Sequence, residues 1–182
     1  MLKAWIIAVF FTILFVAPHA QAHPHVFITP KATLITYDHF VSQINVEWEF
    51  DAMSSSLFLE SAGSNTAEIW NLVFPETQLL ANGEQTTRTG YYTYVEIDGR
   101  IMKDLIPADF TADFVDGSLH CRFTLNINQT VGNTLKIGFS DPTTYNDFDI
   151  QRGNFQILAQ SGATPVLEKQ TENYIDKISL SW

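Results

Sequence analysis

The chain has 182 residues and a formal net charge of −10, with twenty acidic residues against ten basic ones. This balance argues against nucleic acid as a partner, because phosphate binding depends on clustered Lys and Arg. The single Cys121 excludes an internal disulfide. It lies between Leu119 and Phe123 at a spacing of two residues, so it is expected to be a small buried apolar residue.

Residues 1–22 are expected to be a secretory signal peptide. Lys3 gives a positive start, residues 5–16 form an apolar run, and Ala20-Gln21-Ala22 matches a small-residue cleavage site. The run is shorter than the roughly 20 apolar residues that span a bilayer. We therefore expect an exported protein without stable membrane insertion, whose mature chain begins at His23.

The mature chain, residues 23–182, is predicted to form one mainly β (α+β) domain with an antiparallel, sandwich-like fold. Segments rich in β-branched and aromatic residues recur at roughly 8–12 residues, as in a sandwich or barrel. Asp38-His39, Asp98-Gly99 and Asp116-Gly117 are typical of hairpin turns. The predicted strands are Val26–Tyr37, Val41–Asp51, Tyr91–Ile97, Arg100–Ile106, Asp109–Val115, Leu119–Ile127, Thr134–Phe139, Phe155–Ala159 and Tyr174–Trp182.

Residues 52–80 are expected to be a helical insertion of two short helices. Apolar residues recur there at helical spacing, and Gly63-Ser64-Asn65 interrupts the pattern. Asn65 or Thr66 is expected to cap the second helix, and Pro75 to end or kink it.

The first residues of the mature chain, His23-Pro24-His25, predict a metal site. The α-amine and imidazole of an N-terminal histidine can chelate one ion. Residues two apart in a strand lie on the same face, about 6.6 Å from each other, so the imidazoles of His23 and His25 could bind the same ion. Pro24 lacks the amide proton that a square-planar copper or nickel site would need. The remaining imidazole, amine and carboxylate site suits Zn²⁺, Co²⁺, Ni²⁺ or Cu²⁺, and the ligands show no selectivity among them. Zn²⁺ is the ion that we expect, with Ni²⁺, Co²⁺ or Cu²⁺ as alternatives.

Asp51 and Asp141 are the carboxylates expected to complete this site. A hairpin turning at Asp38-His39 places Asp51 opposite Val26, within about one residue of His25, although a slip of one residue would reverse its face. Asp141 leads a polar loop and is either a ligand or a turn residue. Other acidic and histidine residues are weaker candidates: solvent-facing Glu47 and Glu49, incidental His39 and His120, and Asp147 with Tyr145 in the polar loop.

Four motifs in order resemble a family of periplasmic proteins of unknown function, labelled periplasmic components of an uncharacterised transport system and encoded beside nickel/cobalt-type permeases. They are His23–Ile28, Trp48–Asp51, Tyr91–Gly99 and Ser140–Tyr145. The resemblance implies an accessory role in moving zinc or nickel/cobalt between the periplasm and a membrane permease. The family pattern has Asp where this chain has Thr29, and an Asp-rich loop where this chain has Gly63-Ser64-Asn65. Without that Asp-rich loop, the chain lacks the clustered oxygen ligands of a calcium site.

Two rival functions remain open. The first is an oxidative copper enzyme, because an N-terminal histidine that binds copper together with a second histidine resembles the site of such enzymes. The chain has no G-x-S-x-G, H-E-x-x-H or phosphate-binding glycine motif. We therefore expect that it is not an enzyme. The other rival is a metal-free periplasmic interaction module, in which the two histidines only begin a strand.

Overall fold

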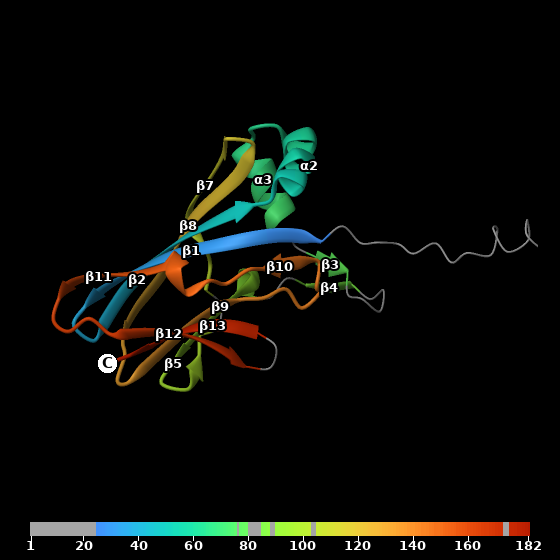
Figure 1. Ribbon diagram of the computed structural model, residues 1–182. Helices are drawn as coiled ribbons and strands as arrows, with labels where there is room; N and C mark the ends of the chain where they lie inside the picture. The colour runs from blue at the N-terminus through green and yellow to red at the C-terminus, as the bar shows by residue number, and fades with distance from the viewer. Residues whose placement is uncertain (1–24, 76, 80–84, 88–89, 103–104, 173–174) are drawn as a thin grey trace, which may run out of the picture.

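The computed structural model describes residues 25–182 except 76, 80–84, 88–89, 103–104 and 173–174, and shows two β-sheets with two helices at one end (Figure 1). This confirms the predicted mainly β, sandwich-like class with a short helical insertion. No helix among the described residues has the length and apolar character needed to cross a membrane.

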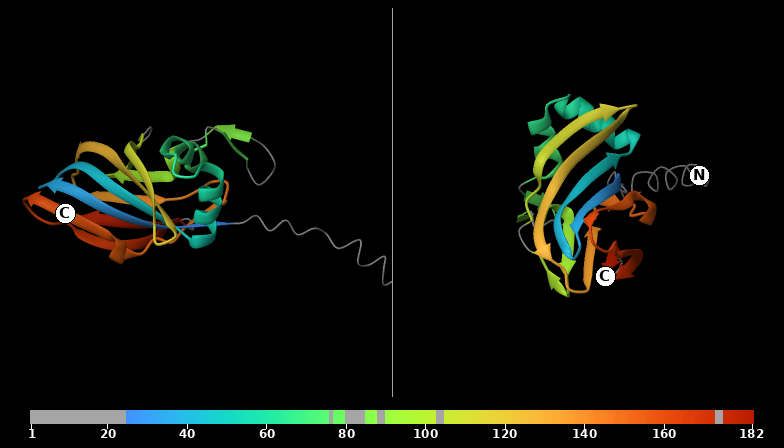
Figure 2. Two further views of the ribbon diagram at one scale, coloured as in Figure 1. Left: turned by 90° about the horizontal axis from the view of Figure 1, so that it is seen from above. Right: turned by 90° about the vertical axis from the view of Figure 1, so that its left-hand side faces the viewer.

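The larger sheet has six strands in the order β10-β1-β2-β8-β7, with β11 also paired to β1. β10 and β11 run parallel to successive parts of β1, and the other pairs are antiparallel. Figure 2 shows the twist of this sheet from two further sides. Its strands are β1 (Val26–Tyr37), β2 (Phe40–Phe50), β7 (Ala108–Val115), β8 (Ser118–Thr130), β10 (Asn146–Phe148) and β11 (Phe155–Ser161).

The smaller sheet has five antiparallel strands in the order β12-β13-β9-β5-β6. A separate hairpin is formed by β3 (Thr77–Leu79) and β4 (Gln85–Thr87). Two 3-10 turns, η1 (Gly90–Tyr92) and η2 (Arg152–Asn154), precede β5 and β11. The strands of this sheet are β5 (Thr93–Ile97), β6 (Arg100–Ile101), β9 (Thr134–Phe139), β12 (Val166–Glu172) and β13 (Ile175–Ser181).

The helices α2 (Ala52–Ala62) and α3 (Thr66–Val73) follow β2 and pack against β8 and β7 (Figure 1). The prediction of two helices separated at Gly63-Ser64-Asn65 is confirmed. Asn65 caps α3, because its side chain accepts hydrogen bonds from the backbone N–H groups of Ala67 and Glu68.

The core lies between the sheets and centres on Trp48 of β2. Its ring meets Phe123 of the same sheet edge-on at 5.0 Å between centroids, and Phe139 of the other sheet edge-on at 5.7 Å. The alternation predicted for this strand is confirmed, since Val46, Trp48 and Phe50 are buried. Strand period two therefore fixes which side chains of β2 face the core and which face outward.

Two predicted strands are shorter in the structure. Tyr91 and Tyr92 have φ angles of 50° and 56°, so β5 begins only at Thr93. The strand predicted over Arg100–Ile106 extends only to Ile101. β3, β4, β10 and β12 were not predicted, because the first three have only three residues each and the sequence of β12 is mostly polar. β3 lies within residues 52–80, which were expected to be helical, so the helices end earlier than predicted, at Val73.

Candidate metal centre

The outer face of the six-stranded sheet carries two rows of polar side chains across neighbouring strands. Cross-strand pairing aligns Thr29, Glu49, His120 and Asp113 in one row. The next row consists of Lys31, Glu47, Arg122 and Thr111. Directly paired residues lie on one face with Cβ atoms about 4.5–5.5 Å apart, so the register of β1, β2, β8 and β7 assembles this cluster.

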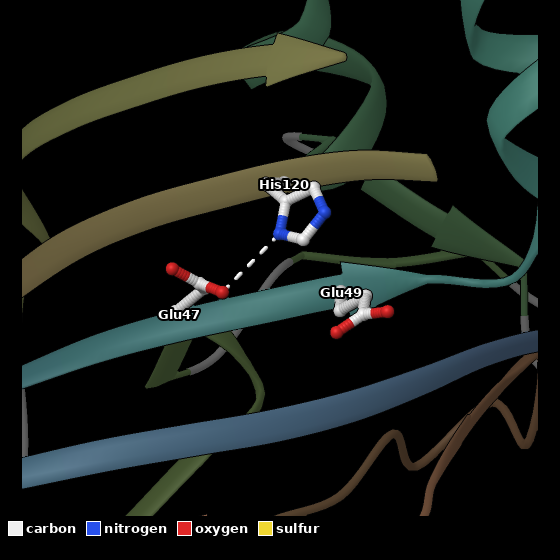
Figure 3. A group of neighbouring side chains, drawn as sticks. All are labelled: Glu47, Glu49 and His120. Atoms are coloured by element: carbon white, nitrogen blue, oxygen red, sulfur yellow. Dashed lines mark hydrogen bonds and ion pairs between the residues drawn. The ribbon is translucent and has the colours of Figure 1, made fainter. Parts of the chain in front are cut away.

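Glu47, Glu49 and His120 together offer three metal-ligand atoms that all lie within 4.8 Å of one another. We call these three residues the outer-face triad. Nδ1 of His120 lies 3.2 Å from Oε1 of Glu47, as Figure 3 shows. One imidazole and two carboxylates are ligands that zinc and its neighbours in the transition series accept.

Two basic side chains already neutralise part of the triad. Lys31 Nζ lies 2.8 Å from Oε2 of Glu49 and 3.4 Å from Oε1 of Glu47. Arg122 Nε donates to Oε2 of Glu47 at 2.6 Å, and its guanidinium also pairs with Asp113. An incoming cation would have to replace the Lys31 ammonium between the two carboxylates.

The carboxylate of Glu47 is held in the form that binds a metal. Partial burial opposes its ionisation, but hydrogen bonds from Arg122 and His120 outweigh that effect, so the pKa of Glu47 lies below its ordinary value. The pKa of Lys31 is raised, chiefly by its hydrogen bond to Glu49. Both groups are therefore charged at neutral pH, and metal binding at Glu47 would need no proton release.

His25, one of the predicted ligands, is exposed immediately before β1 and lines an open groove of about 610 Å³. Asp141 and Asp147 line the same groove, and β10 places Asp147 beside Phe27 in the parallel pairing with β1. The structure thus brings His25 and Asp141 to one groove. The other predicted histidine, His23, lies outside the described residues.

Asp141 is already saturated with hydrogen bonds. Its Oδ1 accepts from the backbone N–H and hydroxyl of Thr143, and its Oδ2 accepts from the backbone N–H and side-chain amide of Asn146. A carboxylate offers about four lone-pair sites, so a metal would have to displace one of these donors. The observed arrangement fixes the turn between β9 and β10, and ligation by Asp141 stays a prediction.

Asp51 occupies a different register from the predicted one. Phe27, not Val26, lies opposite it: Asp51 N–H donates to the Phe27 carbonyl at 3.1 Å, and Phe27 N–H donates to Asp51 Oδ2 at 3.1 Å. The expected register is wrong by one residue because a β-bulge interrupts the pairing between Ile35 and Thr36.

The Asp51 carboxylate also caps α2. It accepts from the backbone N–H groups of Met53 and Ser54 at 2.9 and 3.0 Å, and from the Ser54 hydroxyl. Burial opposes its ionisation, but these hydrogen bonds and the one from Phe27 outweigh it, so the pKa of Asp51 lies below its ordinary value. Its role as a ligand also stays a prediction.

The sequence does not indicate that His120 is a ligand, because it follows a turn and no neighbour in the sequence marks it as one. Its partners come from β2, more than seventy positions earlier. His39 has a structural environment instead: its Nδ1 lies 2.9 Å from the Val131 carbonyl oxygen, and its ring stacks on Trp182.

The chain belongs to the family described as "Protein of unknown function (DUF1007)", which it matches over residues 8–173. No curated protein matches the chain. The match confirms a family of unknown function, and it assigns no location, ligand or partner.

Proposed function

We propose that the protein is a periplasmic accessory protein that binds a divalent transition metal, zinc before nickel, cobalt or copper, and assists a membrane metal permease. The observation that supports it best is the outer-face triad, where three metal-ligating side chains converge within 4.8 Å. The predicted His23-His25 site at the start of β1 is the alternative position for the metal.

Loading of the triad would exchange one cation for another. Lys31 pairs with both glutamates but its side chain is 43% exposed, so the ammonium can move into water. Exposed ion pairs of this kind contribute roughly 0.2–1 kcal/mol each, which is small beside the binding energy of a transition metal. Displacement of the ammonium would therefore oppose metal binding only weakly. Three protein ligands, one fewer than in a closed structural zinc site, would leave a position through which the metal could be passed to a permease.

Thr29 connects the triad to the family pattern. It pairs directly with Glu49 across β1 and β2, so its side chain is the next one in the row that contains His120. The family resemblance predicts Asp at this position. A Thr29→Asp variant would add a third carboxylate beside the triad and should bind zinc more tightly than the native chain does.

The test is calorimetric titration of Zn²⁺, Ni²⁺, Co²⁺ and Cu²⁺ into metal-free protein that begins at His23. We expect one ion per chain, and His120→Gln should weaken zinc binding by at least about tenfold. Lys31→Gln should strengthen it by about two- to fivefold, since it removes the competing cation. Lys169→Gln is the matched control, because it removes the same charge from a pair with Asp176 on the other sheet.

A second set of proteins locates the metal. His25→Ala and a chain with one extra residue before His23 both alter the N-terminal site and leave the triad unchanged. If these two proteins lose zinc while His120→Gln keeps it, the metal lies at the N-terminus and the triad is an ion-pair network. If the native chain binds none of the four ions, the proposed function is wrong.

The interaction module is the second candidate, and helix α2 favours it. Its buried residues are Ser54, Ser55 and Ala62, whereas the larger apolar residues Met53, Leu57 and Leu59 are about half exposed. Helices on a protein surface usually bury their apolar side chains instead. A native chain that binds no metal would make this module the leading account.

A further inference from the structure

Trp48 lies in the middle of the core, and within the described part of the chain its indole N–H lacks the hydrogen-bond acceptor that a buried donor usually has. Its side chain is fully buried, and its indole N–H has no hydrogen-bond acceptor among the described residues. Buried donors are nearly always paired in folded proteins, because an unpaired donor has lost its water without a replacement. A buried indole N–H in this state therefore needs an explanation.

Trp48 borders a small internal chamber of about 70 Å³. A second pocket of about 160 Å³ is lined by residues of α2, α3 and the loop before β10. Four residues line both spaces, namely Val26, Phe58, Leu72 and Tyr145. Leu72 and Tyr145 are 46% and 43% exposed, so the mouth of the outer pocket is formed by partly exposed side chains.

The linings are mainly apolar, although they include Tyr92, Tyr145 and Ser61, and two further polar side chains are engaged elsewhere. The side-chain amide of Asn146 donates to Asp141 at 2.7 Å, and the hydroxyl of Ser54 donates to Asp51. The remaining walls of the inner chamber include Ile28, Phe50 and Val73. A ligand that suits this space is apolar over most of its surface and carries one acceptor for the indole N–H.

We propose that the two chambers bind a small apolar molecule with one hydrogen-bond acceptor oxygen, which accepts from Nε1 of Trp48. Their combined size corresponds to a single ring or a short chain, since an apolar cavity of about 150 Å³ holds benzene. The acceptor lies at the inner end of the ligand, and the hydrocarbon part lies against Phe58 and Leu72. This site is separate from the outer-face triad and does not depend on the proposed metal-binding function.

Two other partners compete for the indole N–H. A water molecule in the inner chamber would accept the bond, and so would the face of a neighbouring ring such as Phe123, which meets Trp48 at 87°. Either partner would remove the preference for a ligand that carries an acceptor. The experiment must therefore compare two probes that differ only in that atom.

Acetophenone and ethylbenzene form such a pair, because they have nearly the same shape and only the first has a carbonyl oxygen. We would titrate each into the ¹⁵N-labelled chain that begins at His23 and follow the indole N–H resonances by NMR. Acetophenone should shift the Trp48 resonance and bind about three- to tenfold more tightly than ethylbenzene. The resonance of Trp182, whose Nε1 donates to the Asp38 carbonyl, should not move and serves as the internal control.

Two variants complete the test. Trp48→Phe removes the donor and should give both probes the same affinity. Leu72→Trp fills the mouth and should abolish binding of both, whereas Leu158→Trp, at an exposed position on β11 outside the pockets, should not. An unshifted Trp48 resonance at saturating acetophenone, or equal affinities in the native chain, would overturn the proposal. If Trp48→Phe does not fold, the native chain together with Leu72→Trp and Leu158→Trp still tests the proposal.

Discussion

Replacing Asp51 tests the structural role that the hydrogen bonds assign to it. Its carboxylate caps α2 through Met53 and Ser54 and also joins the helix to β1 through the N–H of Phe27. Loss of a helix cap costs about 1 kcal/mol, and loss of a further charge-assisted bond at a partly buried position costs about the same. Asp51→Ala should therefore lower the free energy of unfolding by about 2 kcal/mol, or Tm by roughly 4–8 °C.

Asp51→Asn is the matched control, because Asn also caps helices and keeps an acceptor oxygen. Urea denaturation followed by tryptophan fluorescence should show a lower midpoint for Asp51→Ala at an unchanged m-value, with Asp51→Asn close to the native chain. Because the folded-state pKa of Asp51 is depressed, its ionic contribution is present above pH 3.8 and is lost as the pH falls through the folded pKa. The difference between native and Asn chains should shrink over that window. Equal stability of Asp51→Ala and Asp51→Asn at neutral pH would refute the reasoning.

Three further predictions do not depend on metal binding. Burial raises the pKa of the Cys121 thiol to about 12, so a thiol reagent should label it only when the chain unfolds. A Cβ at Gly138 would lie 2.9 Å from a backbone carbonyl oxygen of β13, so Gly138→Ala should cost about 1–3 kcal/mol in a melting experiment, whereas Gly153→Ala meets nothing within 4 Å and should not. Three backbone N–H groups of residues 132–134 depress the pKa of Asp98 below 3.8, so Asp98→Asn should lower Tm at neutral pH, and the difference should vanish as the pH falls through that lowered pKa.

Local sequence patterns were sufficient for much of the fold. The first hairpin, the two helices and the strand Thr134–Phe139 were predicted, because alternation, caps and turn residues all lie within a few positions of one another. Both Asp-Gly turns also form, with positive φ at each residue of the pairs. β10 was missed because its three residues are held by pairing with β1, a contact made across more than a hundred positions.

The site could be predicted only in part for the same reason. Alternation on β2 showed that Glu47 and Glu49 share an outward face, but only the register of β2 against β8 places His120 beside them. A single β-bulge was enough to change which residue faces Asp51. Long-range register therefore decides which side chains meet, and period two decides only the face on which they lie.

Alternation on β2 also separates the two proposed sites, since Glu47 and Glu49 face outward while Trp48 between them faces the core. β2 is hydrogen-bonded to β1 on one side and to β8 on the other. A ligand bound at either site therefore cannot shift β2 without breaking hydrogen bonds of the sheet. A ligand shifts a second site only by its differential affinity for two states of the protein. We therefore expect saturating acetophenone to change zinc affinity by less than about twofold. A larger change, matched by an equal effect of zinc on acetophenone, would show that β2 has two arrangements and that each ligand selects between them.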